Sequence, residues 1–111
     1  MPSLFHILAE PDWRTARALG SYAPASLTSD GFVHFSHAHQ VAGAANRFYR
    51  DQAGLIVVEF DPDRLGQPVV EEDLYGAGEQ FPHVYGAIDT AAAIAEHPLP
   101  RDARGRFSFA F

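Results

Sequence analysis

Residues 30–40, Asp-Gly-Phe-Val-His-Phe-Ser-His-Ala-His-Gln, hold the densest group of side chains able to carry out chemistry. Three histidines, a serine and a glutamine lie where a predicted strand runs into a predicted helix. Such a junction can present backbone N–H groups and polar side chains together to a ligand. Because side chains alternate along a strand, His34 and Ser36 lie on one face and can point into one cleft. We therefore take His34 and Ser36 as catalytic candidates, with capping of the helix as the alternative role of Ser36.

A second segment, Phe-Pro-His-Val-Tyr-Gly at residues 81–86, again places a histidine among aromatic residues. His83 and Tyr85 alternate onto the same strand face, and Gly86 permits close approach of the backbone. Glu71 and Glu72 end the preceding predicted strand, where one of them can act as a general base or bind a ribose diol. His83, Glu71 and Glu72 join the catalytic candidates, and Tyr85 is a candidate for ligand binding.

Two further ligand-binding candidates lie near the N-terminus. His6 stands between two apolar residues of a predicted strand, so it faces away from them and can donate a hydrogen bond to a ligand. The alternative is a core histidine bonded to a backbone carbonyl. Tyr22 can either line the cleft or belong to the core.

Other chemistries fit the histidine cluster less well. His34, His37 and His39 suggest a metal site, but His37 and His39 would lie about 200° apart around a helix. A hydrolase triad of Ser36, His34 and Asp30 lacks the Gly-x-Ser-x-Gly turn that exposes the nucleophile. We expect no bound metal, and we keep a histidine-dependent metal enzyme as an alternative. A non-enzymatic interaction module with structural histidines is the other alternative.

Composition narrows the class of protein. The chain has 111 residues, 47% of them hydrophobic, which predicts one folded domain over residues 1–111. The absence of cysteine excludes disulfides, thiolate metal sites and cysteine nucleophiles. A net charge of −6 argues against binding to duplex nucleic acid, because the phosphates of the duplex are negative as well. No apolar run approaches membrane-spanning length, and no basic leader is present, so we expect no membrane association and a cytoplasmic location.

The hydrophobic pattern predicts short elements that do not alternate as βαβ units. The predicted strands are 4–8, 31–36, 55–60, 69–72, 83–88 and 107–111, and the predicted helices are 11–19, 36–48 and an alanine-rich turn or two after residue 88. Residues 21–30 read as a loop. The nearly continuous apolar run at 55–60 is typical of a central strand. An α+β domain with a split or mixed sheet accommodates these elements best.

The two histidine segments also resemble a known family. Residues 31–36 with Gln40 and Asn46, and residues 81–86, look like the two signature motifs of the family named domain of unknown function 952. Trp13, Tyr22 and Pro24 fit its early positions. On this resemblance Gln40 and Asn46 become candidates for ligand binding.

A more distant resemblance concerns the fold. The opening Leu-Phe-His at residues 4–6 and the Val-His-Phe-Ser at residues 33–36 are similar to motifs of ADP-ribosyltransferase-like domains and of RNA 2′-phosphotransferases. The resemblance implies a nucleotide cleft lined by His6, His34 and Ser36, NAD or ADP-ribose as the ligand, and transfer of an ADP-ribosyl or phosphoryl group. Arginines at positions 14, 17 and 47 would favour an RNA phosphate if they met this cleft.

Overall fold

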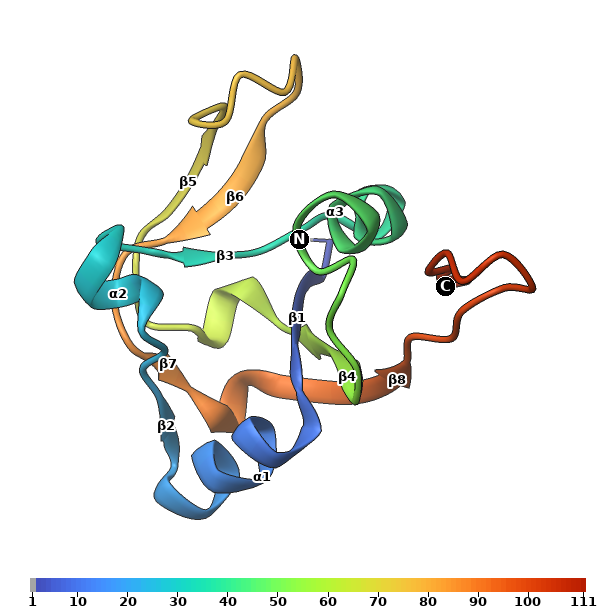
Figure 1. Cartoon of the computed structure of the whole chain (residues 1–111). Coiled ribbons are helices and arrows are strands. Elements are labelled where there is room, and N and C mark those ends of the chain that lie inside the picture. The colour runs from blue at the N-terminus through green and yellow to red at the C-terminus, as the bar shows by residue number, and fades with distance from the viewer. Residues whose placement is uncertain (1) are drawn as a thin grey trace.

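A central antiparallel sheet organises the molecule, whose computed structural model describes residues 2–111 (Figure 1). Its strands are β1 (Leu4–Ala9), β4 (Leu55–Phe60) and β8 (Ala93–Pro98), in the order β1-β4-β8. The apolar run in β4 therefore occupies the central position that its sequence predicts. Because it is covered on both faces, β4 has no need of a polar side, and its one carboxylate, Glu59, is paired with His97.

Two smaller antiparallel sheets complete the strand arrangement. One contains β3 (Val33–His34), β6 (Phe81–Val84) and β5 (Val69–Glu72), in the order β3-β6-β5, and the other pairs β2 (Ser21–Tyr22) with β7 (Ile88–Asp89). In Figure 1, β5 and β6 extend as a hairpin on the side of the molecule opposite α1. An isolated bridge between Phe5 and Ser36 ties β1 to the end of the β3 segment. The expected small α+β domain with a split sheet is confirmed.

The helices are short. They are α1 (Glu10–Leu19), α2 (Ser26–Ser29) and α3 (Val41–Phe48), with 3-10 turns η1 (Ala38–Gln40), η2 (Pro62–Arg64) and η3 (Thr90–Ala92). Helices α1 and α3 pack against opposite faces of the central sheet. As predicted, α1 has a proline in its first turn and ends at Gly20, which adopts a left-handed φ of 80°. Among the residues that the structure describes, no helix is long and apolar enough to cross a membrane.

Several predicted elements are wrong in type or extent. Ser36 does not cap the helix, because the chain enters η1 through His37, whose backbone N–H donates to Gln40 in a capping box. The alanine-rich helix after residue 88 is only the turn η3, and the chain then continues as β8 because it pairs with β4. The predicted terminal strand 107–111 is reduced to one bridge between Arg101 and Phe107. The loop predicted for 21–30 contains β2 and α2.

The predicted strand boundaries around the histidines also shift. The strand expected over 31–36 is regular only at Val33–His34, and the one expected over 83–88 runs instead from Phe81 to Val84. Pro82 lies inside β6, where its carbonyl accepts a hydrogen bond from Phe35 N–H although proline has no N–H to donate in return.

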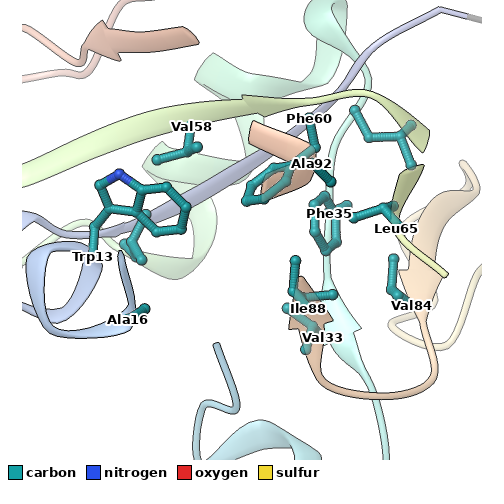
Figure 2. Packing of buried hydrophobic residues seen from close by; sticks show 12 residues of the cluster. Trp13, Ala16, Val33, Phe35, Val58, Phe60, Leu65, Val84, Ile88 and Ala92 are labelled. Carbon is teal, nitrogen blue, oxygen red and sulfur yellow. The ribbon is translucent and has the colours of Figure 1, made fainter. Parts of the chain in front are cut away.

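Two hydrophobic clusters lie on opposite faces of the central sheet, as the alternation along β4 requires. Val58 and Phe60 face the cluster that includes Trp13, Phe35 and Ile88 (Figure 2). The other face of the sheet packs against α3 and Phe107. Since Phe5 and Ile7 face this second cluster, His6 faces the first, as the sequence predicted.

Candidate functional site

Two hydrogen bonds hold the His6 ring and indicate which of its nitrogens carries the proton. Its Nδ1 lies 2.6 Å from the carbonyl oxygen of His34, and its Nε2 lies 2.9 Å from the hydroxyl of Tyr22. Because a carbonyl only accepts, Nδ1–H donates to it and Nε2 accepts from the tyrosine. Burial lowers the pKa of His6 to about 4, so the ring is neutral near pH 7. This is the core histidine bonded to a backbone carbonyl that the sequence left as an alternative.

His34 has one satisfied ring nitrogen and one unsatisfied one. Its Nδ1 lies 3.0 Å from the hydroxyl of Tyr75, while its Nε2 is buried without a hydrogen-bond partner among residues 2–111. Burial, together with the neighbouring His6 and His83, lowers the pKa of His34 to about 3. A buried polar atom without a partner costs free energy, so its persistence points to a ligand atom or a function.

His83 belongs to a carboxylate–imidazole pair. Its Nδ1 lies 2.8 Å from Glu72, and the hydroxyl of Tyr85 donates to the same carboxylate oxygen. The bonds from Tyr85 and then His83 lower the pKa of Glu72, and the bond to Glu72 raises the pKa of Tyr85. Phe32 stacks on the His83 ring with centroids 4.0 Å apart. With Nδ1–H donated to a carboxylate, Nε2 of His83 is left as a lone pair, the arrangement used to orient a general base.

His34 and His83 are direct cross-strand partners of β3 and β6, and their ring centroids are 5.6 Å apart. The Nε2 atoms of both rings are buried and unpartnered within residues 2–111. The pairing register therefore brings two sequence-predicted histidines together. Chemically, such a pair offers two ring nitrogens for hydrogen bonds to a bound group.

A cavity of about 280 Å³ opens beside the first two histidines. His6 and His34 form part of its wall, and the remaining wall residues are Ser26, Asp30, Phe48, Tyr49 and Tyr75. Burial raises the pKa of Tyr75 to about 12, so its hydroxyl stays protonated at neutral pH. The cavity thus combines aromatic walls, neutral hydrogen-bonding groups and one carboxylate.

Several predicted site residues form hydrogen bonds with the backbone of neighbouring segments and do not line the cavity. Ser36 is buried, and its N–H and carbonyl bond to Phe5 in the bridge to β1. The Gln40 amide accepts from His37 N–H and donates to Glu79 and to the Gln80 carbonyl.

Asn46 and Glu71 also lie away from the cavity. The Asn46 side chain donates to the carbonyls of Ala42 and Phe107 and accepts from Phe107 N–H. Glu71 pairs with His37 on the surface. The roles assigned from the sequence to Ser36, Gln40, Asn46 and Glu71 stay predictions, and the cavity does not include them.

Sequence reasoning missed Ser26, Phe48, Tyr49 and Tyr75 of the cavity wall, and Tyr75 falls in the loop after β5. The Asp73 carboxylate accepts from the backbone N–H groups of Ala77 and Gly78, and these bonds lower its pKa. The loop therefore curls back and brings Tyr75 to His34. An aspartate shortly before glycines is a sequence signal for such a turn, although it does not say what the turn approaches.

The metal alternative lacks a full ligand set. Among residues 2–111 no group of three or more His, Asp or Glu side chains is placed to hold a metal ion. His37 and His39 stack on each other with centroids 6.1 Å apart, and His34 contacts Tyr75 instead of joining them.

The arginines are mostly placed away from the cavity. Arg14 forms ion pairs with Glu10 and Glu96, and Arg17 lies over the Trp13 ring. Arg47 alone of the three reaches the cavity wall, with its guanidinium 5.2 Å from the Phe48 ring centroid and 3.5 Å from the Tyr75 carbonyl oxygen. The stripe of three arginines that would favour an RNA phosphate at this cavity is therefore absent.

The fold and the cavity define the chain as a small α+β domain with three antiparallel sheets and a cavity partly lined by histidines. The chain belongs to the family described as protein of unknown function DUF952, whose model matches residues 7–96. The crystal structure of protein CC0527 from Caulobacter crescentus is similar, with 30% identity, a TM-score of 0.83, and coverage of 96% of this chain and 93% of that one. The solution NMR structure of CC0527 matches at 28% identity and a TM-score of 0.72, covering 96% and 91%. No curated protein matches the chain.

Proposed function

We propose that this domain binds a nucleotide of the NAD or ADP-ribose class, with one nucleoside of the ligand in the cavity beside His34. The observation that carries the proposal is that His34 lines an aromatic cavity and has a buried Nε2 without a partner. A ligand hydroxyl or ring nitrogen would satisfy this atom once a neighbouring side chain shifts to expose it.

The wall of the cavity suits the parts of a nucleoside. Phe48, Tyr49 and Tyr75 offer aromatic faces for a heterocyclic ring, and the Asp30 carboxylate can accept from the two hydroxyls of a ribose. The volume of about 280 Å³ is near the lower end, about 300 Å³, of small-molecule sites. It holds one nucleoside, so the phosphates of a dinucleotide lie outside it, on the side where Arg47 contacts Phe48.

The finer fold assignment belongs to the same proposal. The resemblance of residues 4–6 and 33–36 to ADP-ribosyltransferase-like motifs supports a common origin for the cleft, and the small split sheets are compatible with it. His83 does not line the cavity, so the proposal is one of binding. Transfer chemistry would require the ligand to reach Nε2 of His83, with Glu72 orienting the imidazole as general base.

A thermal-shift panel with NAD, ADP-ribose, nicotinamide and ATP tests the proposal. A ligand at 100 times its dissociation constant stabilises the folded state by about 2.7 kcal/mol, which raises the melting temperature of a domain this size by several degrees. We expect such a shift with NAD or ADP-ribose. In His34→Phe the ring volume stays and both nitrogens are lost, so the shift should disappear.

Two controls make the test specific. His39→Phe makes the same chemical change at an exposed histidine outside the cavity and should leave the shift unchanged. Asp30→Asn, at an exposed position, should weaken binding without altering the core, which keeps the test informative if His34→Phe does not fold. An undiminished shift in both His34→Phe and Asp30→Asn, or no shift with any nucleotide, contradicts the proposal.

A further inference from the structure

Four arginines surround a second hollow, beside the C-terminal end of α3. The hollow has a volume of about 350 Å³, and no acidic residue lines it. Arg47 and Arg50 reach it from α3 and the residues that follow, and Arg104 and Arg106 reach it from the C-terminal segment. Arginines up to 59 positions apart in the chain thus line one depression.

This concentration of positive charge is unexpected in an acidic protein. The chain has 8 basic and 14 acidic residues, and half of the basic ones line this hollow. Within residues 2–111, none of these four guanidinium groups forms an ion pair with a carboxylate, whereas Arg14 forms two. Their positive charges are therefore not neutralised by ion pairs among the described residues, and they would attract a bound anion.

The backbone that presents Arg104 and Arg106 is held in place. The Asp102 carboxylate accepts from the N–H groups of both residues, so it caps their turn. The Arg101 guanidinium donates to the Gly105 carbonyl at 2.8 Å and to the Gln52 carbonyl at 2.6 Å. Hydrogen bonds thus fix the turn and attach it to the chain that follows α3. Within the described residues, the side chains of the two arginines on this turn form no hydrogen bond or ion pair.

Asn46, on α3, connects the helix to the C-terminal segment. It lines the hollow, and its amide bonds to both the N–H and the carbonyl of Phe107. Phe107 is buried in the core cluster under α3. The side chain that the sequence suggested as a ligand contact is therefore the clamp that sets the two pairs of arginines opposite each other.

We infer that this arginine hollow binds the phosphate oxygens of a phosphorylated ligand. Guanidinium groups match phosphate oxygens with two parallel hydrogen bonds, and four of them around one depression provide for more than one phosphate group. The hollow is too small for a folded segment of an acidic polypeptide, and the remaining surface, with 14 acidic residues against four arginines, would repel one.

The inference stands without the proposed nucleotide function, although the two are compatible. Arg47 lines the hollow and also contacts Phe48 and the Tyr75 carbonyl, both of which belong to the cavity beside His34. A nucleotide seated in that cavity could therefore direct its phosphates toward Arg47. Only this last link rests on the proposed function.

Titration calorimetry with inorganic pyrophosphate at low ionic strength tests the hollow by itself. We expect saturable binding that is weakened by salt, and at least about tenfold weaker binding in the double variant Arg104→Gln/Arg106→Gln. The double variant Arg17→Gln/Arg64→Gln removes the same charge elsewhere and should change the affinity less than about twofold. His34→Phe should leave pyrophosphate binding intact, so failure of the nucleotide proposal is distinguishable.

Two further ligands identify the source of the phosphate. ADP-ribose that binds tighter than pyrophosphate, and loses affinity in the Arg104→Gln/Arg106→Gln variant, assigns the hollow to a nucleotide. A single-stranded RNA ten-mer that binds tighter than both, with the same loss, assigns it to a polynucleotide backbone. No saturable binding of pyrophosphate to the wild-type protein, or equal losses in both double variants, overturns the inference.

Discussion

His6, His34 and His83 differ in the group that contacts Nδ1 of each ring, and this difference decides what each ring can do. In His6 the partner is a carbonyl, so the ring is a neutral structural group with both nitrogens in use. In His34 it is the hydroxyl of Tyr75, and in His83 it is a carboxylate. Only the last two keep an unpartnered Nε2. Of the three rings, those of His34 and His83 are therefore the ones on which the proposed ligand binding would depend.

The lowered pKa values of His6 and His34 predict a loss of stability in mild acid. Their folded-state pKa values are about 4 and about 3, whereas the ordinary value of histidine is 6.5. Below about pH 6.5 both histidines are therefore protonated in the unfolded chain but stay neutral in the folded one. The free energy of unfolding should fall as the pH decreases from about 6.5 to about 4, with a slope approaching about 2.7 kcal/mol per pH unit when both rings contribute. Urea unfolding across this range measures it.

The variant His34→Phe tests whether His6 and His34 cause this pH dependence. It removes one of the two groups that take up a proton on unfolding, so the slope should fall to about half. Glu72, whose pKa is lowered from 4.5, loses its stabilising contribution only below about pH 4.5, so it does not affect the slope between about pH 6.5 and pH 5. A free energy of unfolding that is constant between about pH 6.5 and pH 5 would contradict the neutral state of these histidines.

At the scale of elements, two glycines have opposite roles. Gly43 lies within α3, and a Cβ added there meets no atom within 4 Å. Gly86 follows β6 with a φ of 154°, and a Cβ there would lie 2.4 Å from the Gln67 side chain. The helix tolerates Gly43 at a cost in backbone entropy, whereas the turn out of β6 requires Gly86. This close approach agrees with the role that the sequence suggested for Gly86.

The same substitution should therefore have opposite effects at the two positions. Gly43→Ala should raise the free energy of unfolding by about 0.5–1 kcal/mol, because alanine has the higher helix propensity. Gly86→Ala should lower it by about 1–3 kcal/mol, because its φ is unfavourable for an L residue and the Gln67 side chain must move. Urea unfolding of both variants measures the difference, and a destabilised Gly43→Ala or an unaffected Gly86→Ala would show that the backbone argument is wrong.

At the scale of the whole molecule, the C-terminal segment is joined to the domain through side chains instead of a strand. Leu99 and Phe107 insert into the core cluster under α3, and the Arg101 guanidinium lies 3.9 Å from the Phe107 ring centroid. Asn46 then bonds to the backbone of Phe107 on both sides. The Asn46 amide therefore positions the segment that carries Arg104 and Arg106 against α3, together with the packing of Phe107 and the Arg101 contacts.

Asn46→Ala should loosen this segment while the central sheet stays folded. It removes the bonds to Phe107 and leaves that residue's N–H and carbonyl without partners, which costs about 1–3 kcal/mol for each buried group left unsatisfied. We expect faster tryptic cleavage after Arg101, Arg104 and Arg106, followed by mass spectrometry, and weaker pyrophosphate binding. Gln52→Ala, at an exposed amide, is the control and should behave as wild type. Equal cleavage of the two variants would mean that other contacts hold the segment.

The sequence by itself determined the parts that depend on near neighbours. The apolar run at 55–60 was sufficient to predict a central strand, and the proline and glycine at the two ends of α1 predicted where it begins and ends. Alternation placed His6 opposite Phe5 and Ile7. The two histidine motifs identified the family. In each case the relevant interactions lie within a few residues, so local pattern contains the information.

Only the tertiary structure decided which of the candidate residues meet. Tyr75 reaches His34 across 41 positions, and Asn46 reaches Phe107 across 61. The alanine-rich segment after residue 92 became β8 because the edge of β4 offered unpaired hydrogen-bonding groups, which outweighed its helix propensity. Long-range pairing also used the polar groups of Gln40 and Asn46 to satisfy the backbone and left Nε2 of His34 and His83 unpartnered. Residue type shows which side chains can do chemistry, but the pairing of distant segments decides which of them remain free to do it.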